Sequence, residues 1–144
     1  MMAELKEIVL VEDDEMDARM TMRALAQNQL ANPIIWVRDG EECLDYLHGR
    51  GSYLSKPAPR VALVLIDIHM PRMNGLELLQ ALRADPGTTR IPAVILSTSS
   101  QHQDVAEGYG KGINAYVVKP VRFAEFMDAV GRLGMFWGVL NRSV

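Results

Sequence analysis

The stretch VALVLIDIHMPRMNG, residues 61–75, joins an apolar run to an acidic residue and then to a helical pattern. Residues 61–66 are apolar without interruption, as in a parallel strand that is covered on both faces. Asp67 follows this run directly. Small and apolar residues then recur on one helix face, at Gly75, Leu78, Leu79 and Leu82. The stretch therefore predicts a strand, a loop and a helix, with a carboxylate at the carboxyl end of the strand.

The same unit recurs on both sides of this stretch. Four more short apolar runs lie at residues 8–11, 34–37, 93–96 and 115–118. A segment of helical character follows each run, although the second and fourth segments, at about 40–48 and 102–111, are short. Five strand–helix units in this order predict an α/β fold: a five-stranded parallel sheet, doubly wound, with five helices.

Composition excludes several classes of protein. The chain has 144 residues, 49% of them apolar, and we expect residues 1–144 to form a single domain with a long polar loop at about 48–60. A net charge of −3 without a basic block argues against a nucleic-acid binder. The single cysteine, Cys43, cannot form an internal disulfide. No apolar run is long enough for a signal peptide or a membrane span, so we expect a cytoplasmic protein with no membrane partner.

Polar residues follow four of the five runs, at the carboxyl ends where open parallel sheets place their functional crevice. They are Glu12, Asp13, Asp14, Asp67, Ser97 and Lys119. Each has a structural explanation of its own; Asp14 and Glu15, for instance, are well placed to cap a helix. Two carboxylates about 4 Å apart repel by roughly 4 kcal/mol at an effective dielectric near 20, so three converging acids call for a cation. Mg²⁺ suits such oxygen ligands, and an aspartate beside it can act as nucleophile and form an acyl phosphate.

Three motifs in family order carry a resemblance to the two-component response-regulator receiver domain. They are IVLVEDDE at 8–15, VLIDIHMPRMNG at 64–75 and AYVVKP at 115–120. The resemblance covers nearly the whole chain. It implies a flavodoxin-like sheet of order 2-1-3-4-5, similar to that of chemotaxis regulators.

The resemblance also implies a role for each matching residue. Asp67 matches the phosphoacceptor, which is also a ligand of the metal, and Asp13 matches a direct ligand of Mg²⁺ or Mn²⁺. Glu12 matches the second acid of the pocket, which contacts the metal through a water molecule. The main-chain carbonyl of His69 matches a further protein ligand of the metal. The switch and phosphate-binding residues are matched by Ser97, Lys119 and Tyr116.

The function implied is that of a stand-alone response regulator and not of an enzyme with a separate substrate. The resemblance implies that a sensor histidine kinase transfers a phosphoryl group to Asp67, that the regulator slowly removes it, and that altered protein contacts carry the signal. His69 occupies a variable position of the family, two residues after the acceptor, and we expect its side chain either to tune hydrolysis or merely to face solvent.

Two features narrow the resemblance to the regulators of phytochrome-type histidine kinases, many of which are dimers. One is the 48–60 loop, and the other is an apolar C-terminal extension at about 134–144. The kinase partner implied is a bacteriophytochrome. Part of the extension should be exposed and form a homodimer surface, made of Phe136, Trp137, Val139 and Leu140. The alternative is that this tail folds back on its own domain.

Three other functions fit the sequence less well. A haloacid-dehalogenase-type phosphatase needs a second Asp two residues after its nucleophile, where this chain has His69. A flavodoxin-like electron carrier needs a hydroxyl- and glycine-rich loop where this chain has Glu12 and Asp13. A transcription factor needs a DNA-binding module, and only 25 residues follow Lys119. Of the remaining residues, we expect Trp36 to pack on the sheet, Cys43 to point inward, and Met16, Met20 and Met22 to fill the core.

Overall fold

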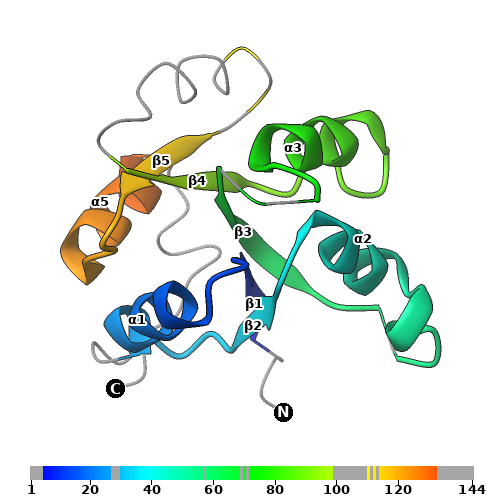
Figure 1. Cartoon of the computed structure of the whole chain (residues 1–144), viewed down its shortest axis with the longest axis horizontal. Coiled ribbons are helices and arrows are strands. Elements are labelled where there is room, and N and C mark those ends of the chain that lie inside the picture. Colours follow the sequence, from blue (N-terminus) through cyan, green and yellow to red (C-terminus); the bar gives the residue numbers. More distant parts are fainter. Residues whose placement is uncertain are drawn as a thin grey trace.

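The computed structural model describes residues 5–26, 30–56, 58–68, 70, 72–98, 110, 112 and 114–132 (Figure 1). The elements are, in chain order, β1 (Glu7–Val11), α1 (Glu15–Ala26), β2 (Ile34–Val37), α2 (Gly40–His48), the 3₁₀-helix η1 (Gly51–Tyr53), β3 (Val61–Asp67), α3 (Gly75–Ala84), β4 (Ala93–Ser97), β5 (Ala115–Val118) and α5 (Phe123–Arg132). Each predicted strand is present, within one residue of its expected ends. The fourth predicted helix, at about 102–111, and the extension at 134–144 lie outside the described residues.

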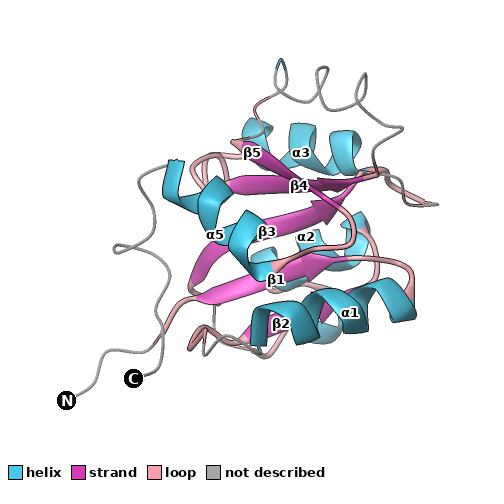
Figure 2. Cartoon of the chain, turned by 90° about the vertical axis from the view of Figure 1, so that its left-hand side faces the viewer, coloured by secondary structure: helices cyan, strands magenta, loops and turns pink. Residues whose placement is uncertain are grey.

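The strands form one parallel sheet in the order β2-β1-β3-β4-β5, which confirms the predicted doubly wound fold. Helices α1 and α5 cover one face, and α2 and α3 cover the other (Figures 1 and 2). Alternate strand residues feed two separate apolar clusters. The cluster under α1 and α5 includes Leu10, Leu25 and Phe126, and the cluster under α2 and α3 includes Val9 and Leu78. Burial on both faces explains why the strands are apolar without alternation.

The expected loop at about 48–60 begins with an ordered turn against α2. The Tyr53 hydroxyl donates to Glu42 at 2.7 Å, and the rings of Tyr46 and Tyr53 meet edge to face at 5.0 Å. Gly49 ends α2 in the left-handed conformation, with φ of 66°, which glycine adopts without strain. The start of the long connection is thus fixed by contacts with the preceding helix.

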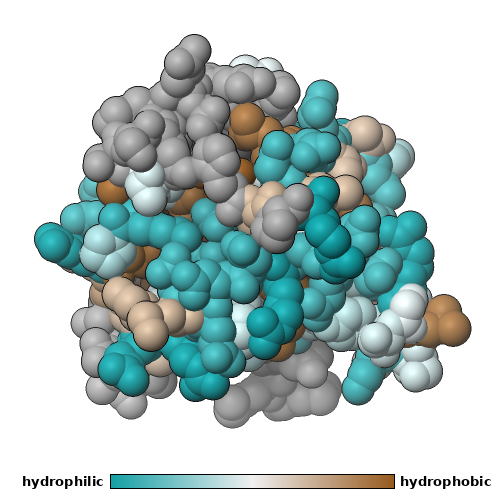
Figure 3. Space-filling view, viewed as in Figure 1, coloured by the Kyte–Doolittle hydropathy of each residue, from teal (hydrophilic) through white to brown (hydrophobic). Residues whose placement is uncertain are grey.

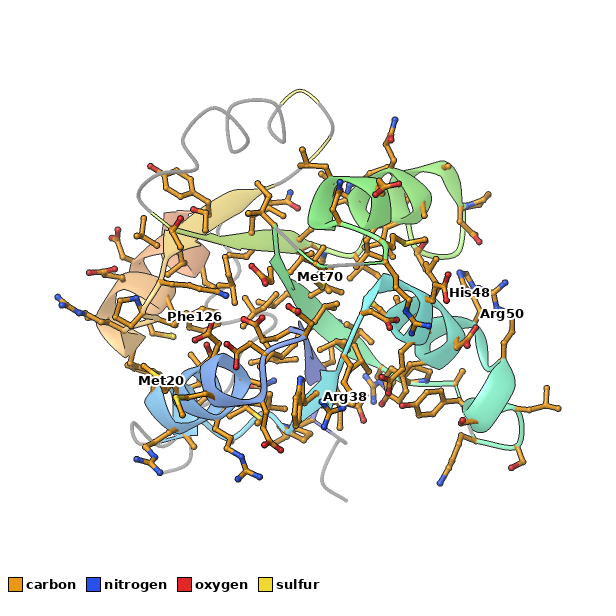
Figure 4. All side chains as sticks on the ribbon, viewed as in Figure 1. Met20, Arg38, His48, Arg50, Met70 and Phe126 are labelled. Atoms are coloured by element: carbon orange, nitrogen blue, oxygen red, sulfur yellow. The ribbon has the colours of Figure 1, made fainter. Side chains whose placement is uncertain are left out.

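The methionines of α1 differ from the prediction. Met16 and Met20 are 70% and 51% exposed, so they do not fill the core; Met20 is labelled in Figure 4. The helix buries the stripe formed by Ala18, Thr21 and Leu25, and Met16 and Met20 lie about half a turn away from it. Met22 lies beside the stripe and packs partly against the cluster, in agreement with the prediction. Cys43 is fully buried, as expected.

The face of the molecule shown in Figure 3 is mainly hydrophilic where its residues are described. On the face shown in Figure 3, the apolar atoms of the described residues form small, scattered patches. Among these residues, no helix is both long enough and apolar enough to cross a membrane.

Arg83, near the end of α3, ties the entrances of β4 and β5 together. Its guanidinium donates to the carbonyl oxygens of Thr89, Ile91 and Gly112 at 2.8–3.0 Å and to the side chain of Asn114 at 3.1 Å. Asn114 also accepts from the main-chain nitrogen of Ala93 at 2.8 Å. One partly buried planar cation therefore satisfies several carbonyl groups at the edge opposite the carboxyl ends.

Helix α3 begins directly against the end of β3. Asn74 caps it in a reciprocal capping box with Glu77. A Cβ atom on Gly75 would lie 2.6 Å from the carbonyl oxygen of Asp67 and 2.8 Å from the Cα of Ile68. Because both neighbours are backbone atoms, neither can move aside cheaply.

We therefore predict that Gly75→Ala lowers the free energy of unfolding by about 1–3 kcal/mol, as overpacking does. The matched control is Gly131→Ala, on an exposed part of α5 where a Cβ would meet no neighbouring atom of the described residues within 4 Å. That change should be neutral or stabilising by up to about 1 kcal/mol, because alanine favours helix. Urea unfolding of the three proteins measures both effects, and equal stabilities for the two variants would contradict the close packing at Gly75.

Candidate phosphoacceptor and cation site

The fold brings the predicted polar residues to one edge of the sheet. Glu12 and Asp13 follow β1, Asp67 ends β3, Ser97 ends β4 and Lys119 follows β5. These four strands are neighbours in the sheet and run parallel, so their carboxyl ends lie side by side. The candidate site therefore draws on residues more than 100 positions apart in the chain.

Three of these residues form an acidic cluster. Carboxylate oxygens of Glu12, Asp13 and Asp67 lie within 4.8 Å of one another. Glu12 and Asp67 are buried, whereas Asp13 is exposed. Hard oxygen donors with one side open to solvent are what Mg²⁺ and Mn²⁺ prefer, because these ions keep several waters and take few carboxylates. The donor set thus fits a divalent cation.

Lys119 supplies the positive charge of the pocket. Its Nζ lies 2.6 Å from Oε1 of Glu12, 3.3 Å from Oδ1 of Asp67 and 3.1 Å from Oδ2 of Asp17. Burial acts to lower the pKa of Lys119, but its hydrogen bond to Glu12 and the charge of Asp67 outweigh burial and raise it. Lys119 therefore stays protonated and neutralises part of the acidic cluster.

Glu12 is the most deeply buried of the acids, with no exposed surface. Burial raises its pKa well above the usual range of a glutamate, the hydrogen bond from Lys119 acts to lower it, and Asp67 raises it further. A cation in the cluster would favour the ionised carboxylate by the same electrostatic logic. The site therefore gains from a positive charge beyond that of Lys119.

Ser97 and Tyr116 occupy different parts of the β4–β5 pair. Ser97 is only 2% exposed, and its carbonyl oxygen accepts from the main-chain nitrogen of Lys119 at 2.7 Å. Tyr116 pairs in register with Ile95, further from the carboxyl edge, and is 40% exposed. Of the other predicted site residues, His69, Phe136, Trp137, Val139 and Leu140 lie outside the described residues.

Asp17 is a site residue that was not identified from the sequence. It lies in the first turn of α1, one helical turn beyond Asp13, and its carboxylate contacts Lys119. The sequence signal was its spacing of four residues from Asp13, but an acid in a first helical turn is ordinarily explained by the helix dipole. Asp14 behaves as that explanation predicts, because its side chain accepts from the main-chain nitrogen of Met16 at 2.9 Å.

Comparison with known proteins agrees with this geometry. Residues 8–131 match the response regulator receiver domain family. Response regulator Rcp1 of Synechocystis sp. is 32% identical over 132 residues, which cover 92% of this chain and 88% of that protein.

Two solved structures are similar as well. The bacteriophytochrome response regulator AtBRR is 44% identical, with a TM-score of 0.87, and the match covers 97% of this chain and all of that one. The Mn²⁺-bound form of Rcp1 is 30% identical, with a TM-score of 0.72 and coverage of 96% and 99%. The sheet order, the clustered acids, the lysine that follows β5 and the match across 8–131 lead to one conclusion: this chain belongs to the response regulator receiver domain family.

Proposed function

We propose that Asp67 accepts a phosphoryl group from a phosphohistidine of a sensor histidine kinase. The observation that carries the proposal is the convergence of two further carboxylates and one ammonium group on a nearly buried Asp67. In the reaction, a carboxylate oxygen of Asp67 bonds to phosphorus as the phosphorus–nitrogen bond of the donor breaks. The electron pair of that bond stays on the imidazole nitrogen, and the product is an acyl phosphate.

The surrounding residues divide the remaining tasks. Asp13, Asp67 and the main-chain carbonyl of His69 would hold Mg²⁺ or Mn²⁺ directly, and Glu12 would do so through a water molecule. The bound cation would neutralise charge on the acids and on the phosphoryl oxygens. Lys119 would contact another phosphoryl oxygen, and the Ser97 hydroxyl a third. Water attack on the acyl phosphate would later release inorganic phosphate and restore Asp67.

Signalling would then be a shift between two conformations. Contacts of Ser97 and Lys119 with the phosphoryl group exist only in the phosphorylated protein, so they favour one arrangement of the segments after β4 and β5. Tyr116, half-exposed on β5, would change position with them. In this proposal residues 1–144 form a single domain. Its output is a change in its contacts with other proteins.

We further propose a bacteriophytochrome as the kinase partner and a homodimer as the working form. The likeness to AtBRR, a bacteriophytochrome response regulator, supports the partner. The apolar residues Phe136, Trp137, Val139 and Leu140 support the dimer by their composition alone.

The first prediction concerns the acceptor. With Mg²⁺ and acetyl phosphate, the wild-type protein should gain the mass of one phosphoryl group, and Asp67→Asn should gain none, because an amide is not a nucleophile here. Asp14→Asn is the matched control, since Asp14 caps α1 and does not belong to the cluster. Intact-mass spectrometry distinguishes the three proteins, and labelling of Asp67→Asn would place the acceptor elsewhere.

The second prediction concerns the cation. At a concentration about ten times its Kd, Mg²⁺ should stabilise the folded protein by about 1.4 kcal/mol and raise Tm by roughly 4 °C. Asp13→Asn should lose most of this increase, because it removes a charged ligand. Thermal denaturation with and without Mg²⁺ measures the effect; a full increase in Asp13→Asn would exclude Asp13 as a ligand.

The third prediction concerns assembly. Leu140→Ser should shift the protein from dimer to monomer in sedimentation equilibrium, because it removes apolar surface from the proposed interface. Leu54→Ser is the control, since Leu54 is an equally large apolar residue that is 77% exposed on the connection after α2 and does not belong to the proposed surface. A monomeric wild type, or equal dissociation of both variants, would contradict the proposed surface.

A further inference from the structure

Trp36 connects the edge strand β2 with the acidic cluster. It pairs in register with Leu10, and its ring is partly buried against the cluster under α1 and α5. The packing role expected of Trp36 is therefore confirmed, but the indole also has a polar contact. Its Nε1–H donates to the carbonyl oxygen of Glu12 at 2.8 Å. The guanidinium of Arg38, labelled in Figure 4, lies 4.4 Å from the centre of the same ring.

The acceptor of this hydrogen bond lies between two acids of the site. The Glu12 carbonyl belongs to the peptide unit that joins Glu12 to Asp13, and such a unit is planar. The neighbouring unit is held as well, because the Glu12 nitrogen donates to the carbonyl oxygen of Val37 at 3.0 Å. Both main-chain groups of Glu12 are thus bonded to β2, one through the backbone and one through the indole.

This arrangement fixes the direction in which the two acids leave the backbone. Glu12 and Asp13 project from residues that share the peptide plane held by Trp36, and they converge on Asp67. β1 ends at Val11, so the strand ladder no longer constrains this peptide plane. Rotation of the plane would separate the two carboxylates, and groups that orient metal ligands from behind commonly change metal affinity 10–100-fold.

We propose that Trp36 is a positioning residue for the divalent cation, acting through its indole N–H on the peptide unit between Glu12 and Asp13. The inference rests on the proposed cation site and deepens it. Trp36 touches neither the cation nor the phosphoryl group. Its contribution is to present two carboxylates together, so that the cation does not have to order them on binding.

The test removes the indole N–H and leaves the ring in place. In Trp36→Phe, the Kd for Mg²⁺ measured by calorimetry should rise by about three- to tenfold, as expected for the loss of one orienting hydrogen bond. A second protein, with benzothienylalanine at position 36, keeps the two-ring shape and replaces only the N–H by sulfur; it should show the same rise. Arg38→Ala is the control, because it removes the cation above the ring and keeps the N–H. Its Kd should stay within about twofold of wild type.

Two further measurements separate positioning from a purely structural role. Circular dichroism and Tm without Mg²⁺ show whether each variant is folded at the temperature of the titration. If Trp36→Phe is unfolded there, the Mg²⁺ affinity of the benzothienylalanine protein decides the question. In the wild type, the indole N–H resonance absent from Trp36→Phe should shift on addition of Mg²⁺. If the indole had a purely structural role, its replacement would lower Tm without changing the Mg²⁺ affinity. The indole resonance of the wild type would then not shift on addition of Mg²⁺.

The outcomes distinguish the inference from the function on which it rests. Equal Mg²⁺ affinity in the wild-type and benzothienylalanine proteins overturns the role of Trp36 and leaves the cation site intact. Absence of Mg²⁺ binding by the wild-type protein overturns the cation site and the inference together. Weaker binding in both position-36 proteins, with Arg38→Ala unchanged, supports the positioning role.

Discussion

The charge balance around Lys119 is the constraint on which the organisation of this protein depends. Its ammonium group contacts Glu12, Asp17 and Asp67, and two of these three carboxylates belong to the acidic cluster. Carboxylates so close together and so little exposed would repel strongly without a counter-charge. Lys119 reaches them only because β5 lies beside β4 and β4 beside β3. The strand order and the electrostatics of the site therefore require each other.

The segments that follow β1 and β3 are loops, but hydrogen bonds and close packing hold their backbone in place. Gly75 lets α3 begin in contact with the end of β3, and the capping box of Asn74 and Glu77 fixes that start. On the other side of the cluster, both main-chain groups of Glu12 are bonded to β2. A rigid acidic cluster suits a cation that demands regular geometry, because little ordering remains to be done on binding. The exposed side chain of Asp13 leaves one side of the cluster open to solvent.

The positions of the site residues in the structure agree with those expected of the receiver family. The family predicts an acceptor aspartate at the end of β3 and a lysine after β5, and the structure places these side chains 3.3 Å apart. Contacts such as those of Trp36 and Asp17 come from this chain's own geometry. They show how one member builds the surroundings of a shared site.

The sequence by itself determined the strands, the fold class and the residues at the carboxyl ends of the strands. Strands that are buried on both faces are apolar without interruption, and such runs are visible in the sequence. Polar residues directly after such runs then identify the site edge without knowledge of distances. Only the tertiary structure decided that Met16 and Met20 face outward, that Asp17 contacts Lys119, and that the indole of Trp36 bonds to Glu12. Each depends on the rotation of a helix or on atoms brought together from distant strands. The local sequence pattern indicates which residues of an element face the core. It does not indicate which residues the other faces of that element will contact.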